Sequence, residues 1–268
     1  MDHSTSTSTF ADIMSARTRD RQHRPLLTVY DDTVGTRTEL SYATVDNWAA
    51  KSANLLVEEL DLGPGATVAL DLDGHWTTAV LTLACWKAGI AVTRHATGTH
   101  VDVVCCHTTR LSAHDTGPVL VVGDGLRAEP VEPVAPRAGL VLLGEDVHAF
   151  ADDHDAADVH PTTPALVTDA TTLDHAGVLR RAQRWRGALG DGARVGLAGT
   201  LDDDAALLLL AGVVAAGGSV VTARPVTTAP PWGRWETERV TVAAGRCDAL
   251  SGAPDGLATV ELTATHDA

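Results

Sequence analysis

Apolar and polar positions alternate along the first half of the chain in blocks that predict strands separated by helices. Short apolar or alternating runs of strand length lie at 26–30, 38–42, 67–72, 90–92, 101–106 and 119–122. Two longer segments, 42–60 and 76–88, have apolar residues at helical spacing, and glycines follow both of them. Strands separated by helices favour parallel pairing.

The same alternation restarts after a stretch rich in proline. Prolines recur at 130, 133, 136, 161 and 164, which predicts a surface loop and then a boundary near residue 160. Beyond it the pattern predicts strands at 165–168, 194–198, 218–222, 239–244 and 258–263, and helices at 174–189 and 203–216. The predicted fold class is α/β, with mostly parallel sheets flanked by helices. We expect residues 1–160 to form one α/β subdomain, disordered to about residue 8, and residues 161–268 to form a second.

The longest apolar run, 205–221, reads AALLLLAGVVAAGGSVV. It is slightly short for a membrane span and contains two adjacent glycines. We therefore predict a buried helix, a glycine turn and a buried strand.

Composition narrows the range of partners. The 268 residues include 35 acidic and 20 basic side chains, for a formal net charge of −15. Such a surface repels phosphate backbones and anionic lipid, so we expect neither a nucleic-acid nor a membrane partner. The N-terminus lacks the apolar segment of a signal peptide, and Cys85 and Cys105 lie in apolar contexts. These features predict a cytoplasmic protein with reduced, buried thiols.

Three phrases in the first hundred residues share their order and spacing with a known superfamily. They are TELSYATVD (38–46), LGPGATVAL (62–70) and ACWKAGIAV (84–92). With them, this region resembles the N-terminal portion of adenylate-forming enzymes, which include acyl-CoA synthetases and nonribosomal-peptide adenylation domains. The resemblance implies a truncated version of their N-terminal domain, because members of the superfamily are much longer. The whole chain is similar to a short actinobacterial-type branch related to AMP-binding proteins.

The resemblance also locates a degenerate phosphate loop. The family's loop, T-S-G-T-T-G-x-P-K-G-V, falls without gaps on residues 168–178, between a predicted strand and a predicted helix. The matching positions, which would be vestigial nucleotide-binding residues, are Thr168, Thr171, Thr172 and Gly177. The loop glycines are replaced by Ala170 and Leu173, the lysine by Ala176, and a serine by Asp169.

These replacements remove what a phosphate loop needs. Glycines let backbone amides turn toward the phosphates, and the lysine supplies a cation. Asp169 and Asp174 instead add carboxylates where an anion would bind. We interpret the loop as vestigial for ATP. We expect segment 168–177 at the C-terminal end of a strand, and neither inside a helix nor on an antiparallel hairpin.

Other constellations have simpler structural interpretations. Segment 119–128, VLVVGDGLRA, has a loose dinucleotide-binding pattern, but the prolines after it exclude the required helix, so we predict a turn. The residues with ligand chemistry for a metal are His148, Asp152, Asp155, His154, His160, Cys105, Cys106 and His107. We interpret them as structural, with no metal bound. Residues 202–204, three aspartates before an apolar run, are interpreted as a helix cap.

The resemblance leaves two functions open. The favoured one is a noncatalytic ligand-binding or protein-interaction module, without catalytic residues and without a cofactor. The family's adenine-site and ribose-site phrases and its C-terminal catalytic lysine are missing, since no lysine follows Lys87. The alternative is a minimal acyl- or aryl-adenylate ligase that uses ATP, AMP and Mg at an unconventional or partner-completed site. The expected partner is a protein or a small molecule, and an oligomer is compatible with both.

Overall fold

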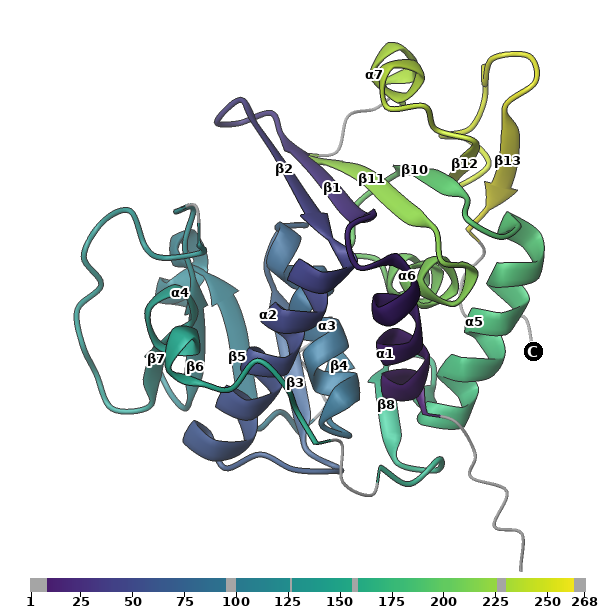
Figure 1. Ribbon diagram of the computed structural model, residues 1–268. Helices are drawn as coiled ribbons and strands as arrows, with labels where there is room; N and C mark the ends of the chain where they lie inside the picture. The colour runs from purple at the N-terminus through teal and green to yellow at the C-terminus, as the bar shows by residue number, and fades with distance from the viewer. Residues whose placement is uncertain (1–8, 95–99, 126, 156–158, 226–229, 263–268) are drawn as a thin grey trace, which may run out of the picture.

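The computed structural model describes residues 9–94, 100–125, 127–155, 159–225 and 230–262. Two mostly parallel sheets enclose a layer of helices (Figure 1). The predicted α/β fold class is confirmed. The expected disorder of the first eight residues lies outside the described residues.

The first sheet has six strands in the order β13-β12-β10-β11-β1-β2. Their bounds are β1 (Pro25–Asp31), β2 (Thr36–Ser41), β10 (Arg194–Ala198), β11 (Ser219–Arg224), β12 (Val242–Gly245) and β13 (Ala258–Glu261). Every neighbouring pair is parallel except the hairpin β1–β2. The N-terminal hairpin thus joins a sheet made otherwise from the C-terminal part of the chain.

The second sheet has seven strands in the order β7-β6-β5-β3-β4-β8-β9. Their bounds are β3 (Thr67–Asp71), β4 (Ala91–Thr93), β5 (Val103–His107), β6 (Val119–Val122), β7 (Leu140–Leu142), β8 (Pro164–Val167) and β9 (Thr172–Asp174). Only the edge pair β8–β9 is antiparallel. Both sheets contain strands from either side of residue 160, so the sheets do not separate at that position.

Helices α3 and α6 are buried between the sheets, α5 lies alongside α6, and α1 packs against other helices of this layer (Figure 1). The α-helices are α1 (Phe10–Arg21), α2 (Tyr42–Asn54), α3 (Trp76–Lys87), α4 (Leu143–Asp146), α5 (His175–Leu189), α6 (Asp204–Ala216) and α7 (Trp232–Thr237). The short helical segments are η1 (Leu55–Glu59), η2 (Thr108–Ala113) and η3 (Val147–Ala149). One continuous apolar core includes side chains of both sheets and of the helices between them.

The apolar run 205–221 forms the centre of this core. Helix α6 is buried from Ala205 to Ala216, which explains why it is apolar on every side. Gly217, with a φ of 61°, ends the helix in the left-handed conformation, and β11 follows. The predicted helix, glycine turn and strand are confirmed. In the described part of the chain, no helix is long and apolar enough to cross a membrane.

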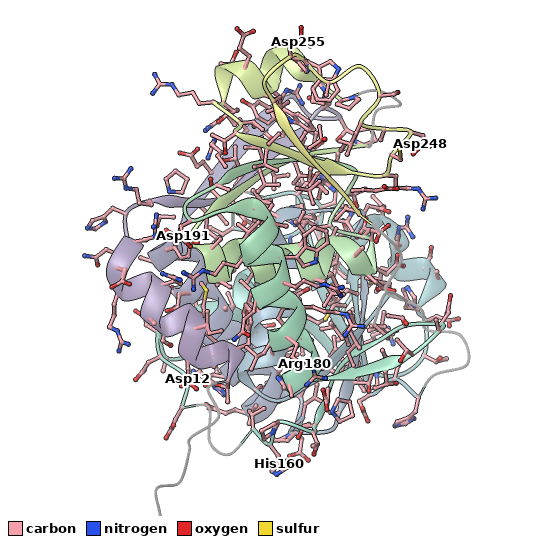
Figure 2. All side chains as sticks on the ribbon, turned by 90° about the vertical axis from the view of Figure 1, so that its right-hand side faces the viewer. Asp12, His160, Arg180, Asp191, Asp248 and Asp255 are labelled. Carbon is pink, nitrogen blue, oxygen red and sulfur yellow. The ribbon has the colours of Figure 1, made fainter. Side chains whose placement is uncertain are left out.

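Charged side chains cover the outside of the molecule. Figure 2 labels several exposed ones, among them Asp12, Arg180, Asp191 and Asp255. The proline-rich segment 127–137 contains no helix or strand in its described residues, as predicted for a surface loop. The buried positions of Cys85 and Cys105 are also confirmed.

Candidate functional site

The segment matched to the phosphate loop is the tip of a hairpin. Residues 168–171 connect β8 to β9, which return antiparallel with Leu166 opposite Leu173. The expectation that this segment avoids an antiparallel hairpin is therefore wrong, although it does follow the C-terminal end of β8. Leu173 is 8% exposed and belongs to the core, so burial of this side chain favours strand pairing over an open loop.

The hairpin turn satisfies its own backbone amides. The Thr168 hydroxyl oxygen accepts from the amides of Thr171 at 3.0 Å and Ala170 at 3.3 Å. The Thr168 amide and hydroxyl both donate to the Thr171 carbonyl, each at 2.9 Å. These three amides are consequently hydrogen-bonded within the turn and do not form an inward-facing cradle.

The remaining matched positions lie in two other elements. Thr172 is an exposed residue of β9, and Gly177 is in the first turn of α5. The Asp174 carboxylate caps this helix by accepting from the Gly177 amide at 2.6 Å. The four positions predicted to bind nucleotide, Thr168, Thr171, Thr172 and Gly177, are thus distributed over a turn, a strand and a helix.

A second polar site lies where strands of both sheets end. The Arg224 guanidinium, at the end of β11, bridges the carboxylates of Asp31 at 2.5 Å and Asp124 at 2.6 Å. Asp31 ends β1, whereas Asp124 follows β6 of the other sheet. The imidazole Nε2 of His107, at the end of β5, lies 3.1 Å from the same Asp124 oxygen. Carboxyl ends of parallel strands are where open α/β sheets bind ligands.

Hydrogen bonds fix the protonation of two histidines at this site. Nδ1 of His75 accepts from the Thr77 amide at 3.3 Å and lies 2.8 Å from the Thr77 hydroxyl. His107 has the same arrangement with Thr109, at 3.4 Å and 2.9 Å. Since Nδ1 is the acceptor, the ring proton is on Nε2 in the neutral form. Burial lowers the pKa of His75 to about 3, so His75 is a neutral Nε2–H donor at pH 7.

The two carboxylates stay ionised. Burial raises the pKa of Asp31, but hydrogen bonds from Thr33 and the charge of Arg224 outweigh it and lower the pKa overall. Burial also raises the pKa of Asp124, but hydrogen bonds and charge from Arg224 and His107 outweigh it and lower the pKa overall. The site therefore holds two carboxylates, one guanidinium and a neutral donor.

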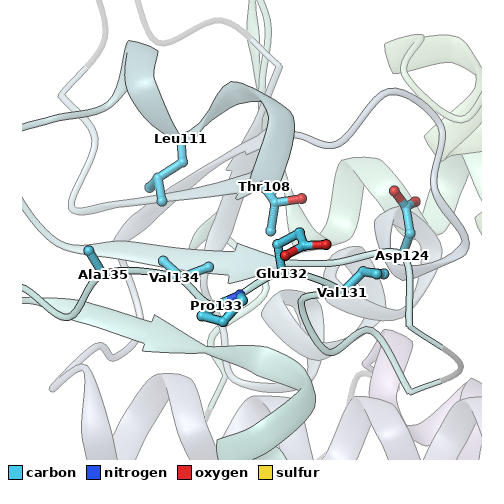
Figure 3. A pocket seen from close by; sticks show the side chains of 8 residues that line it. All are labelled: Thr108, Leu111, Asp124, Val131, Glu132, Pro133, Val134 and Ala135. Carbon is cyan, nitrogen blue, oxygen red and sulfur yellow. The ribbon is translucent and has the colours of Figure 1, made fainter.

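Two cavities adjoin this cluster, and Asp124 lines both. One, of about 260 Å³, is also lined by Asp31, His75, Trp76 and Arg224. The other, of about 450 Å³, lies between η2 and residues 131–135 (Figure 3). The geometry suits hydrogen bonding and charge recognition of a small molecule, and a nucleophile next to a base is not among the residues that line the cavities.

Two other sequence-derived candidates have structural roles. Asp203 caps α6 through the Ala205 amide at 2.7 Å, and Asp202 pairs with Arg94 at 2.5 Å, which confirms the capping interpretation. The predicted turn after β6 is confirmed by a bond from the Gly123 amide to the Ala128 carbonyl at 2.8 Å. No group of three potential metal ligands is assembled among the described residues.

Sequence reasoning missed the polar cluster, although a local signal exists. A His-x-Thr pattern recurs at His75, His107 and His160, and in each case Nδ1 lies within 2.9 Å of the threonine hydroxyl. The pattern indicates histidines whose Nδ1 is engaged by the threonine, which leaves Nε2 to face other groups, as it does at His107 toward Asp124. The order of strands in the sheet decides which of these histidines lie close together, and that order differs from the order of the strands in the sequence.

Two mostly parallel sheets with helices between them define the N-terminal fold of adenylate-forming enzymes. Residues 16–107 match the family described as AMP-binding enzyme. A protein of Mycobacterium tuberculosis that carries only a family designation is 42% identical over 91 residues, which are 34% of this chain and 37% of that protein.

Solved structures extend the likeness to most of the chain. A putative long-chain-fatty-acid CoA ligase from Rhodopseudomonas palustris has a TM-score of 0.72 and 18% identity, covering 96% of this chain and 70% of its own. The fatty acyl CoA synthetase of Mycobacterium tuberculosis has a TM-score of 0.70 and 15% identity, covering 90% and 50%. Likeness at this identity establishes the fold. The chain spans 37% of the family-designated protein and half of the synthetase.

Proposed function

We propose that this chain is a noncatalytic ligand-binding or protein-interaction module built on the fold of adenylate-forming enzymes. The observation that carries the proposal is the closed turn at residues 168–171, in which the amides of Thr168, Ala170 and Thr171 bond to oxygens of the same turn. A phosphate would have to compete with these bonds, and Ala176 stands at the position of the lysine in the family's loop.

Charge around the turn acts in the same direction. The Asp174 carboxylate already occupies the N-terminus of α5, where a phosphate would otherwise be attracted. A carboxylate that lies about 4 Å from a phosphate costs roughly 4 kcal/mol of repulsion at an effective dielectric constant of about 20. ATP, AMP and Mg are therefore not expected as cofactors, and the proposed ligand is a small molecule or a protein.

The test is ATP–pyrophosphate exchange with a panel of fatty and aromatic carboxylic acids, with a full-length acyl-CoA synthetase as the positive control. We expect exchange no higher than without protein, and no heat of binding for ATP, AMP or acyl-CoA by calorimetry. Carboxylate-dependent exchange, or micromolar ATP affinity, would establish the alternative, a minimal acyl- or aryl-adenylate ligase.

A further inference from the structure

Exposed apolar side chains concentrate at the two cavities next to Asp124. Among the described residues, the large hydrophobic side chains that remain exposed are Val34, at 56%, and Val131, at 71%. Val34 lines the smaller cavity and Val131 lines the larger one. Both cavities thus offer apolar contact area beside the same carboxylate.

The larger cavity has an apolar wall and two acidic side chains. Its apolar wall consists of Leu111, Val131, Pro133, Val134 and Ala135. Its polar groups are Thr108, Asp124 and Glu132. In Figure 3 Ala135, Val134 and Leu111 lie on the left and Glu132 and Thr108 in the centre, with Val131 and Asp124 on the right. Its volume of about 450 Å³ is within the ordinary range for small-molecule sites.

Asp124 retains an oxygen for a ligand. The bonds from His107 and Arg224 both end on Oδ1, and within the described ranges Oδ2 accepts no hydrogen bond. Arg224 is shared with Asp31, so these three side chains carry one net negative charge. Glu132 adds another, and the chain as a whole carries −15. The larger cavity, which has Asp124 and Glu132 and no Lys or Arg in its lining, therefore favours a cation over an anion, whereas Arg37 and Arg224 balance Asp31 and Asp124 in the smaller one.

The smaller cavity contributes a hydrogen-bond donor. His75 is 4% exposed, its Nδ1 is engaged by Thr77, and its Nε2 has no partner in the described part of the chain. Because the ring lines the cavity, an unpaired N–H is available to a ligand there. The Nε2 atom is not fully closed off from solvent, so its N–H can be donated to water or, in place of water, to an acceptor atom of a ligand in the cavity.

We propose that the adjoining cavities bind a small organic cation, in which a protonated amine contacts Asp124 and Glu132. A compact apolar body packs against Leu111 and residues 131–135, and an acceptor oxygen receives the Nε2–H of His75. The binding of an organic cation goes beyond the proposed function, because its site is separate from the hairpin turn and requires no nucleotide.

The ligand series tests the three features separately. The probe is phenylalaninamide, which combines an amine, an aromatic body and a carbonyl oxygen. We expect it to bind more tightly than 2-phenylethylamine, which lacks the carbonyl, and the amine to bind more tightly than 2-phenylethanol. The anion 3-phenylpropanoate should not bind. Affinities are measured by calorimetry and by two-dimensional NMR titration of the wild-type chain, without ATP.

Variants test the location. Glu132→Gln, in a surface loop, should lower the affinity for phenylalaninamide severalfold without loss of folding. Asp124→Asn should lower this affinity by roughly tenfold or more. Glu236→Gln, an exposed acid on α7, is the matched control and should leave affinity unchanged. Three outcomes would overturn the proposal. They are equal affinity for the amine and the alcohol, no binding of phenylalaninamide to the wild type, and unchanged affinity in Glu132→Gln. None of these outcomes depends on adenylate formation.

Discussion

At the scale of single residues, His175 is a buried histidine whose ring makes no hydrogen bond within the described part of the chain. It is 2% exposed, and neither ring nitrogen has a hydrogen-bond partner among the described residues. Burial lowers its pKa to about 4, against an ordinary value of 6.5. A neutral imidazole in the core therefore makes the folded state sensitive to acid.

The sign of this effect follows from proton binding. Between pH 6.5 and about 4 the unfolded chain binds a proton at His175 that the folded chain does not. Stability is therefore fully present above pH 6.5 and is lost as the pH falls toward 4. Each pH unit in this window costs about 1.4 kcal/mol for one such histidine.

We predict that His175→Leu reduces the slope of this pH dependence, because it removes one titrating group, whereas His75, whose pKa burial lowers to about 3, keeps part of the slope. Urea unfolding at several values between pH 7.5 and pH 4 measures the slope. The control is His23→Gln, at an exposed position, which should keep the slope of the wild type. Identical slopes for His175→Leu and wild type would show that His175 does not titrate in this way.

At the scale of elements, the hairpin β8–β9 depends on one hydroxyl. The Thr168 side chain accepts from two amides of the turn and donates to the Thr171 carbonyl. Thr172, four residues on, is exposed on the second strand. The two threonines therefore make a matched pair for measuring what the turn contributes.

Thr168→Val should destabilise the protein by about 1 kcal/mol, because it removes these bonds without changing the side-chain volume much. Thr172→Val should be close to neutral, since valine suits an exposed strand position. Urea midpoints of both variants at pH 7.5 give the comparison. A Thr168→Val variant as stable as Thr172→Val would mean that water replaces the turn bonds at no cost.

The pattern of the sequence predicted most elements because most strands and helices are long enough to show a period. The strand predicted at 194–198 and the helix at 174–189 match β10 and α5 closely. Strand β9 was missed because its three residues, Thr172–Asp174, include a single apolar side chain, Leu173. Helix α1 was missed because only Phe10, Ala11 and Met14 are buried, although Thr9 and Asp12 form a capping box.

The sites were harder to predict than the elements. The matched threonines were found in the sequence, but an ungapped comparison could not reveal that Leu173 is needed in the core. Asp31, Asp124 and Arg224 each follow or end a strand, as many polar residues do. Only the strand order, set by packing across the whole molecule, brings these three together.

At the scale of the whole molecule, both sheets combine strands from the two sides of the boundary predicted near residue 160. Strand β1 pairs with β11, and β4 pairs with β8. One apolar core extends through both sheets. A cut near residue 160 would therefore expose strand edges and core side chains in both pieces.

We predict that residues 1–160 and 161–268, produced separately, each lack a cooperative unfolding transition, whereas the intact chain unfolds in a single step. Near-ultraviolet circular dichroism during thermal unfolding reports this, because it follows the packing of aromatic side chains. Mixing the two pieces should restore part of the signal. A sharp transition in either isolated piece would instead support two subdomains that fold on their own.

The pairing of β1 with β11 has a consequence for the chain while it is being made. Leu27 reaches its partner Val220 only after roughly 190 further residues have been synthesised, which takes roughly 10 to 40 s at ordinary translation rates. During this time the strands from β3 to β9 can assemble, whereas the β1–β2 hairpin keeps one edge unpaired. On the ribosome, this N-terminal edge is where a nascent-chain chaperone would have most to protect.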